Sequence, residues 1–196
     1  MTVEETALPG VLRVRPDVYS DDRGAFMETY QAKRYAQAGI DATFVQDNVS
    51  RSEENVLRGL HLQNPHPQGK LVYVLEGAVY DVVVDVRPSS DTFGQWMGTT
   101  LDAWAGQLYV PEGYAHGFVV TDGPALFAYK CTDVYAPSSE LSIRWDDPDL
   151  NIDWPVDDPV VSEKDAEAPL LREVDPARLM VLPDTQPKPA SAQQDG

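Results

Sequence analysis

Short apolar runs rich in valine, leucine and tyrosine recur along most of this chain, and glycine, proline and aspartate residues separate them. The runs follow one another at intervals of roughly 8–12 residues, which is the spacing of strands joined by turns. Chains that alternate strands with helices need longer connections between successive strands. The pattern therefore predicts an all-β fold, either a sandwich or a barrel.

The predicted strands follow these runs along the chain. Asp21-Asp22-Arg23-Gly24 predicts a turn before the second strand, and Glu76-Gly77 predicts a tight hairpin turn between the fifth and the sixth. The predicted strands are Val11–Arg15, Ala25–Thr29, Phe44–Val49, Val56–Leu62, Lys70–Leu75, Ala78–Val86, Trp96–Leu101, Gln107–Val110, His116–Val120, Ala125–Cys131 and Leu141–Trp145.

Two short helices are predicted beside the strands. Gln31–Ala38 consists of good helix formers, and Gly39 follows at the position of a C-cap glycine. Ser162–Glu167 opens with a serine that suits an N-cap. From Asp184 onward the chain has almost no apolar residues, so we expect a single domain over residues 1–183 and a disordered tail over residues 184–196.

The charge of the chain restricts its partners. It has 196 residues, with 15 Lys and Arg against 32 Asp and Glu, which gives a formal net charge of −17. Binding to nucleic acid or to anionic membranes needs a basic surface, so neither is expected. An anionic substrate stays compatible, because a few basic residues can line one cleft of an acidic protein.

Cysteine usage and hydropathy indicate the compartment. Cys131 is the single cysteine, which excludes an intrachain disulfide framework and a cysteine-based zinc site. The amino terminus lacks the positive start and apolar run of a signal peptide. No stretch approaches the roughly 18 apolar residues of a membrane span. We expect a soluble, cytoplasmic protein.

Histidine is the side chain best suited to proton transfer near neutral pH. The chain has three, of which His61 and His116 lie in dense motifs. In a strand over Val56–Leu62, alternation places Arg58 on one face and His61 on the other, with Gly59 leaving room above the imidazole. A hydrogen-bonded, inert histidine in a barrel wall would explain the same pattern.

A metal site is not expected. Histidine metal sites usually need three or four convergent ligands. His61 and His66 are separated by a loop that contains Pro65 and Pro67. Only Glu76 and His116 remain as obvious further ligands.

Two tyrosines are candidate proton donors. Tyr129 and Tyr135 are six residues apart and would share a face if the strand ran unbroken. Half-buried aromatics of a barrel wall explain them equally well. We interpret the acidic runs as solvated turns and not as sites; they are Asp146–Asp149 and Asp157-Asp158.

A series of motifs, taken in this order, resembles the dTDP-4-dehydrorhamnose 3,5-epimerases, cupin-type enzymes of nucleotide-deoxysugar synthesis. The resemblance covers residues 10–170, and the ordered series is far more specific than any one motif. The motifs are Gln46-Asp-Asn-Val-Ser50, Arg58-Gly-Leu-His61-Leu-Gln63, Gly69-Lys70-Leu-Val72, Glu76-Gly-Ala-Val-Tyr80, Asp85-Val-Arg87, Phe93-Gly94, Pro111-Glu-Gly-Tyr-Ala-His116-Gly-Phe118, Tyr129-Lys130, Tyr135-Ala-Pro137, Ile143-Arg-Trp-Asp-Asp-Pro148 and Ser162-Glu-Lys-Asp165.

The resemblance implies a cupin jelly-roll barrel with a few short peripheral helices, a homodimer, and no metal or organic cofactor. It implies a substrate of the type dTDP-4-dehydro-6-deoxy-D-glucose. The C4 ketone of such a sugar acidifies the hydrogens at C3 and C5, because the carbanion delocalises into an enolate. Epimerisation then needs a base, an acid on the opposite face, and a donor or cation at the ketone oxygen.

The resemblance also assigns roles to individual residues. His61 matches the base and Asp165 its orienting carboxylate. Lys70 matches the cation near the ketone, and Tyr129 the proton donor on the opposite face. Tyr135 matches an aromatic that stacks on the thymine.

Further nucleotide and sugar contacts follow by the same resemblance. Arg23, Arg58 and Lys164 make chemical sense as diphosphate partners, because their cations form charge-assisted hydrogen bonds. A surface arginine in a turn is the plainer interpretation of Arg23. The full set of matched contacts is Arg23, Glu28, Gln46, Asn48, Arg58, Lys70, His116, Tyr135, Glu140 and Lys164.

Two departures from the family concern selectivity. Family members commonly have Asp-Tyr-Tyr where this chain has Asp133-Val134-Tyr135, and the segment Asn64–Gln68 is unusual. Relatives include enzymes that invert only C3 or only C5, so a single-centre epimerase of an antibiotic-type pathway is an alternative. A non-catalytic sugar-nucleotide-binding barrel and a metal-dependent cupin oxygenase are the others.

Overall fold

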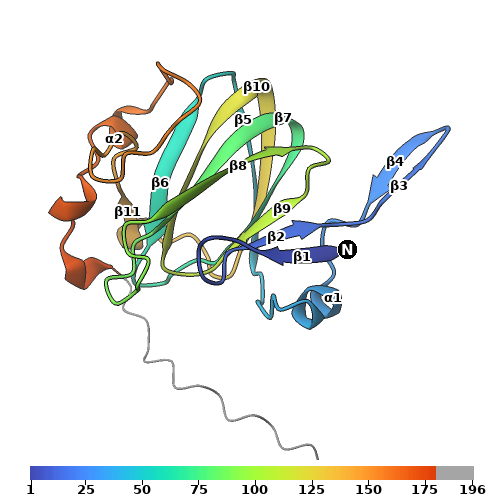
Figure 1. The fold of residues 1–196 in the computed structure, drawn as a ribbon, viewed down its shortest axis with the longest axis horizontal. Coiled ribbons are helices and arrows are strands. Elements are labelled where there is room, and N and C mark those ends of the chain that lie inside the picture. The colour runs from blue at the N-terminus through green and yellow to red at the C-terminus, as the bar shows by residue number, and fades with distance from the viewer. Residues whose placement is uncertain (180–196) are drawn as a thin grey trace, which may run out of the picture.

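Two long antiparallel strands form the spine of the molecule. A computed structural model describes residues 1–179, and in it β7 (Lys70–Asp85) pairs with β10 (Tyr114–Cys131) along almost their whole lengths. Figure 1 shows the two strands side by side at the centre of a strongly curved sheet. The all-β prediction is confirmed.

The two halves of the spine belong to two facing sheets. The first half of β7 pairs with β9 (Gln107–Val110), and the second half of β10 pairs with β5 (Gln46–Ser52). Beyond β9, this sheet continues through β2 (Leu12–Arg15) to β1 (Thr2–Glu5).

The second sheet contains the other halves. There β7 pairs with β8 (Trp96–Asp102), and β10 pairs with β6 (Leu57–Gln63), which in turn pairs with β11 (Glu140–Ser142). Two sheets that share long strands and face each other make the predicted jelly roll.

The predicted hairpin turn at Glu76-Gly77 is wrong. Residues 70–85 are one strand, and the predicted strands His116–Val120 and Ala125–Cys131 are likewise one strand. Gly77 has φ +76°, and a Cβ there would lie 2.5 Å from the Asp122 carbonyl oxygen. The glycine therefore permits an irregular step in which β7 stays against β10 while both cross from one sheet to the other.

Apolar side chains lie in three layers. The layer between the sheets contains Val74, Val83 and Phe127 among others. A second layer, which includes Val82 and Val84, packs beneath the carboxy-terminal segment. Because β7 is covered on both faces, its valines form a continuous run instead of alternating with polar residues. The third layer joins the first sheet to the amino-terminal helix.

The predicted helices are confirmed as short peripheral elements. The first is α1 (Ala32–Gln37), and its residue Tyr35 is buried against the first sheet. The second is α2 (Glu163–Ala166), which Ser162 caps through its side chain. Three one-turn 3-10 helices cover Pro137–Ser139, Leu171–Glu173 and Pro176–Arg178. Residues 180–183 and the predicted tail lie outside the described residues.

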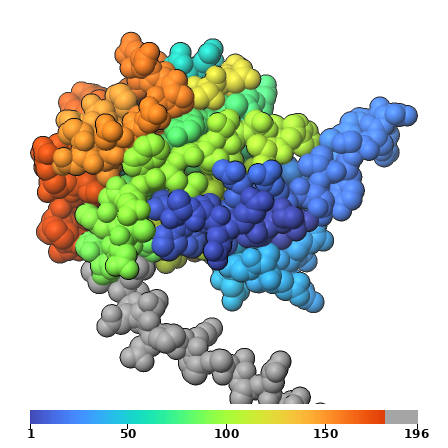
Figure 2. All heavy atoms as spheres, viewed as in Figure 1, coloured from blue at the N-terminus to red at the C-terminus, as the bar shows by residue number. Residues whose placement is uncertain are grey.

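A hairpin arm projects from this body. It consists of β3 (Val18–Asp21) and β4 (Gly24–Met27), which pair only with each other among residues 1–179. The predicted turn at Asp21–Gly24 lies at its tip. Figure 2 shows the arm standing clear of the body, and Tyr19 and Phe26 on it are exposed. Over the same residues, no helix is long and apolar enough to cross a membrane.

Candidate active site

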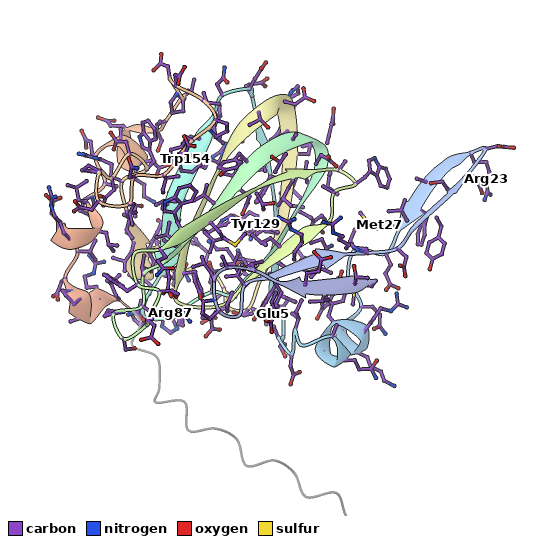
Figure 3. All side chains as sticks on the ribbon, viewed as in Figure 1. Glu5, Arg23, Met27, Arg87, Tyr129 and Trp154 are labelled. Carbon is purple, nitrogen blue, oxygen red and sulfur yellow. The ribbon has the colours of Figure 1, made fainter. Side chains whose placement is uncertain are left out.

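A cavity of about 180 Å³ opens between the two sheets. Both walls contribute polar groups, with His61 coming from β6 in the second sheet and Tyr129 from the part of β10 that belongs to the first. Figure 3 labels Tyr129 in the middle of the barrel. The lining residues are Ser50, Arg58, His61, Lys70, His116, Phe118, Phe127 and Tyr129.

The alternation predicted for β6 is wrong at its centre. Arg58 and His61 both line the cavity, although strict alternation places them on opposite faces. His116 lies opposite His61 and Phe118 opposite Arg58, so three steps along β6 match two steps along β10. The extra residue is a β-bulge, which turns Arg58 to the side of His61.

Gly59 makes this bulge possible. Its φ is +128°, and a Cβ at this position would lie 2.6 Å from the Gly117 Cα. Only a residue without a side chain allows β6 to approach β10 so closely. Room for a backbone, and not room above the imidazole, is therefore the reason for glycine at this position.

His61 and Asp165 form the central pair of the site. The His61 Nε2 lies 2.6 Å from Asp165 Oδ1, and the two side chains are 30% and 5% exposed. Gly59 N–H donates to Asp165 Oδ2 at 3.4 Å. Burial alone would raise the pKa of Asp165, but the hydrogen bond and charge of His61, with help from Gly59 and Ser162, outweigh it and lower the pKa. The anionic carboxylate therefore favours a proton on Nε2 and leaves Nδ1 to act as a base.

Lys70 and Tyr129 occupy the same cavity and respond to burial in opposite directions. Burial lowers the pKa of the Lys70 ammonium, while the negative groups Asp81 and Glu140 partly restore it. Burial raises the pKa of Tyr129, and the nearby Cys131 raises it further. Tyr129 is thus a protonated phenol near neutral pH, as a proton donor must be.

His116 has a carboxylate partner that the sequence analysis missed. Its Nε2 lies 2.8 Å from Oδ2 of Asp81, which is fully buried, and its ring stacks on Phe127. An aspartate inside the valine run of β7 is the signal that could have indicated this pair.

Tyr135 and Glu140 line a smaller hollow that also reaches His61, Lys70 and Tyr129. The Tyr135 hydroxyl donates to Glu140 Oε2 at 2.9 Å, and Lys164 Nζ lies 2.6 Å from the same oxygen. Burial raises the pKa of Glu140, but these two partners outweigh it and lower the pKa.

Gln46 and Asn48, both on β5, complete this part of the site. Gln46 accepts the backbone N–H of Tyr135 at 2.8 Å, which fixes the tyrosine loop to β5. Gln46 also donates to Asn48 Oδ1 at 3.0 Å.

Two matched contacts lie elsewhere. Arg23, whose side chain is 89% exposed, pairs with Asp21 at the tip of the arm, far from Tyr129 (Figure 3). Glu28 pairs with Arg34 of α1. Neither residue lines the cavity of its own chain, so their matched roles as substrate contacts stay predictions.

His66 also lies apart from the cavity, in an exposed loop beside Asp133. Within residues 1–179, no group of three or more His, Cys, Asp and Glu side chains is arranged to hold a metal ion.

The arrangement suits proton transfer at carbon. One wall supplies a carboxylate-oriented imidazole, the other supplies a phenol, and the Lys70 side chain lies in the same cavity. A carbon acid held between the walls would meet a base on one face and an acid on the other, and Lys70 in its protonated form would stabilise a developing oxyanion.

Comparison with known proteins agrees with this geometry. The family model for dTDP-4-dehydrorhamnose 3,5-epimerase matches residues 5–173. The dTDP-4-dehydrorhamnose 3,5-epimerase of Salmonella typhimurium is 51% identical over 175 residues, which are 87% of this chain and 96% of the relative.

A solved structure and a more distant relative extend the comparison. The crystal structure of dTDP-6-deoxy-D-glucose-3,5-epimerase from Legionella pneumophila, in complex with dTDP-4-keto-L-rhamnose, has a TM-score of 0.89 and 49% identity and covers 93% of this chain and 98% of its own. The dTDP-4-dehydrorhamnose 3-epimerase of Streptomyces niveus is 38% identical over 92% of this chain and 88% of its own. This chain therefore belongs to the dTDP-4-dehydrorhamnose 3,5-epimerase family and is an isomerase.

Proposed function

We propose that this enzyme inverts C3 and C5 of a dTDP-linked 4-keto-6-deoxyhexose. The observation that carries the proposal is the His61–Asp165 pair in one wall of a cavity whose other wall supplies Tyr129. The ligand named for the Legionella pneumophila structure is a sugar nucleotide of this class.

The proposed reaction begins with His61. Its Nδ1 takes the hydrogen from C3 or C5, and the C–H electron pair moves into the C4 carbonyl to give an enolate. The imidazolium formed is stabilised by Asp165, and the enolate oxygen by the ammonium of Lys70. Tyr129 then gives its proton to the opposite face of the same carbon, and the ketone is restored. His61 returns its proton to solvent and Tyr129 regains one.

The nucleotide would extend from the cavity toward Tyr135, which we propose as the aromatic that stacks on the thymine. Arg58 and Lys164 lie where they could neutralise the diphosphate, since both line a hollow that also touches His61. Gln46, Asn48, His116 and Glu140 are proposed to complete the contacts.

A single-centre epimerase is the second candidate. Val134 replaces the tyrosine common in the family at this position. It is exposed, and it precedes Tyr135, which lines the smaller hollow. The Streptomyces niveus relative is named a 3-epimerase. Where the second proton is delivered depends on small displacements of the sugar, so a change next to Tyr135 can alter the outcome.

A homodimer would give the arm a partner surface. Arg23 is too far from the cavity of its own chain, yet it is the matched diphosphate contact at the tip of an arm that exposes Tyr19 and Phe26. We propose that the arm of one subunit packs against a second subunit, which buries these two rings. The arm would then place Arg23 and Glu28 at the site of that second subunit.

We also propose that the protein is located in the cytoplasm.

Deuterium exchange tests the proposed reaction. The 4-keto sugar nucleotide, incubated with enzyme in deuterated water, should gain deuterium at C3, C5 or both, and NMR of the product separates the double from the single epimerase. His61→Ala should abolish the exchange. Saturable binding without exchange at either carbon would instead support a non-catalytic binding protein. Activity that is lost on chelation would support a metal-dependent cupin.

A further inference from the structure

The inward face of β5 is polar along its whole length. Gln46, Asn48, Ser50 and Ser52 point toward the barrel interior, and the residues between them are exposed. A strand that lines an apolar core would carry apolar residues at these positions. The four side chains therefore face something polar.

Three of the four have partners within the protein. Gln46 and Asn48 bond to each other, and Gln46 also holds the backbone of Tyr135. The Ser52 hydroxyl accepts from Arg58 Nε at 2.9 Å. These contacts account for the polar residues at both ends of the strand.

Ser50 is the exception. Its Oγ is buried and has no hydrogen-bond partner among residues 1–179. It lines the same cavity as His61, Lys70 and Tyr129. A buried hydroxyl without a partner is unfavourable, so each such group in a native protein calls for an explanation, and a partner outside the chain is one.

We propose that Ser50 Oγ hydrogen-bonds the C2 hydroxyl of the sugar ring and makes the enzyme selective for sugars that retain this group over 2-deoxy sugars. The inference rests on the proposed function. In a 4-keto-6-deoxyhexose joined to a nucleotide through C1, hydroxyls remain only at C2 and C3. The C3 hydroxyl moves when its carbon is inverted, whereas the C2 hydroxyl keeps its place and can be held by a fixed group throughout the reaction.

Paired substrates test the inference. The kcat/KM for deuterium exchange is measured with the dTDP-linked 4-keto-6-deoxy sugar and with its 2-deoxy analogue, for the wild type and for Ser50→Ala. The wild type should prefer the 2-hydroxy sugar by about tenfold or more, because a site that bonds a hydroxyl rejects the analogue without it. Ser50→Ala should reduce that preference about fivefold or more, mainly by slowing the 2-hydroxy substrate.

Ser142→Ala is the matched control. The Ser142 hydroxyl is also buried without a partner among residues 1–179, but it lines a different hollow. That hollow includes Glu140 and Lys164 but not His61, Lys70 or Tyr129. Removal of the Ser142 hydroxyl should leave the substrate preference unchanged. The thermal unfolding midpoint of Ser50→Ala should not fall below that of the wild type, since no hydrogen bond within the described residues is lost and an unpartnered buried hydroxyl is removed.

The outcomes separate the two proposals. If the wild type exchanges neither sugar, the proposed function fails. If it exchanges the 2-hydroxy sugar but Ser50→Ala leaves the preference unaltered, or if Ser50→Ala lowers the unfolding midpoint, the assignment of Ser50 is overturned while the proposed function stands.

Discussion

Asp165 reaches His61 across 104 residues of sequence, and the two side chains meet at 2.6 Å. The carboxylate comes from α2, a one-turn helix that lies outside the second sheet, and the imidazole comes from the middle of β6. The Ser162 cap and the Gly59 N–H hold Asp165 in place. The His61–Asp165 pair is therefore formed without substrate.

Asp165→Asn should slow exchange at both carbons by about 10²-fold or more. The amide keeps the shape of the carboxylate but no longer stabilises an imidazolium. Single-turnover deuterium exchange measures the effect, and an unchanged rate would mean that His61 acts without Asp165.

The same variant should alter the dependence of stability on pH. The pKa of Asp165 in the folded protein lies below its ordinary value of 3.8, so the carboxylate stabilises the fold above that pH and the contribution is lost as the pH falls through the folded pKa. The free energy of unfolding is measured in urea at pH 7 and near pH 3. Between these two pH values it should fall less for Asp165→Asn than for the wild type.

Tyr129→Phe should retain exchange and impair inversion by about 10²-fold, because abstraction by His61 persists while the donor on the opposite face is missing. NMR of the product measures both quantities in one sample. Tyr109→Phe is the control, since burial also raises the pKa of Tyr109, but its ring packs outside the cavity near α1. Equal loss of exchange and inversion in Tyr129→Phe would argue against the assigned role.

Lys70→Met should reduce kcat/KM for exchange by about 10²-fold to 10³-fold, because the enolate oxygen loses its cation. The unliganded variant should unfold at a higher urea concentration than the wild type at pH 7. Burial lowers the pKa of Lys70, so carrying its charge costs folding free energy at any pH below its ordinary pKa, and methionine removes that cost. Lys130→Met, which removes an ammonium paired with Asp47 outside the cavity, serves as the control: it should leave kcat/KM for exchange unchanged and should not raise the urea midpoint.

Gly59→Ala should lower the free energy of unfolding by about 3 kcal/mol, because a Cβ would meet the backbone of Gly117. Gly24→Ala separates the clash from the backbone strain. Gly24 has φ +131°, close to the +128° of Gly59, but no atom lies within 4 Å of its added Cβ. In chemical denaturation, the free energy of unfolding of Gly59→Ala should be well below that of Gly24→Ala. Equal losses of unfolding free energy in the two variants would refute the close-approach explanation.

Mixed dimers test the arm. Arg23→Ala should lower kcat/KM by about tenfold or more, through loss of a charge-assisted contact. Subunits with Arg23→Ala, assembled at random with an equal amount of His61→Ala subunits, should recover about a quarter of wild-type activity, because half of the dimers then contain one complete site. If Arg23 contacted the substrate bound by its own chain, mixing would restore no activity.

Local features of this protein follow from the sequence by itself. The helices that end near Gly39 and begin after Ser162, the turn at the tip of the arm and most strand positions depend on neighbouring residues. The sequence did not predict β1 and β3. Ordered motifs also identified the candidates His61, Lys70, Tyr129 and Asp165, although only through resemblance to a family. Spacing by itself did not distinguish His61 from an inert histidine in a barrel wall.

Only the tertiary structure decided what depends on contacts between distant strands. The bulge at Gly59 turns Arg58 to the side of His61, and it exists because β10 approaches β6 there. The step at Gly77 likewise depends on the Asp122 backbone, which no local rule for a hairpin turn includes. Burial of the Ser50 hydroxyl is a property of the closed barrel, because period-two alternation predicts which face a side chain takes but not what lies opposite it.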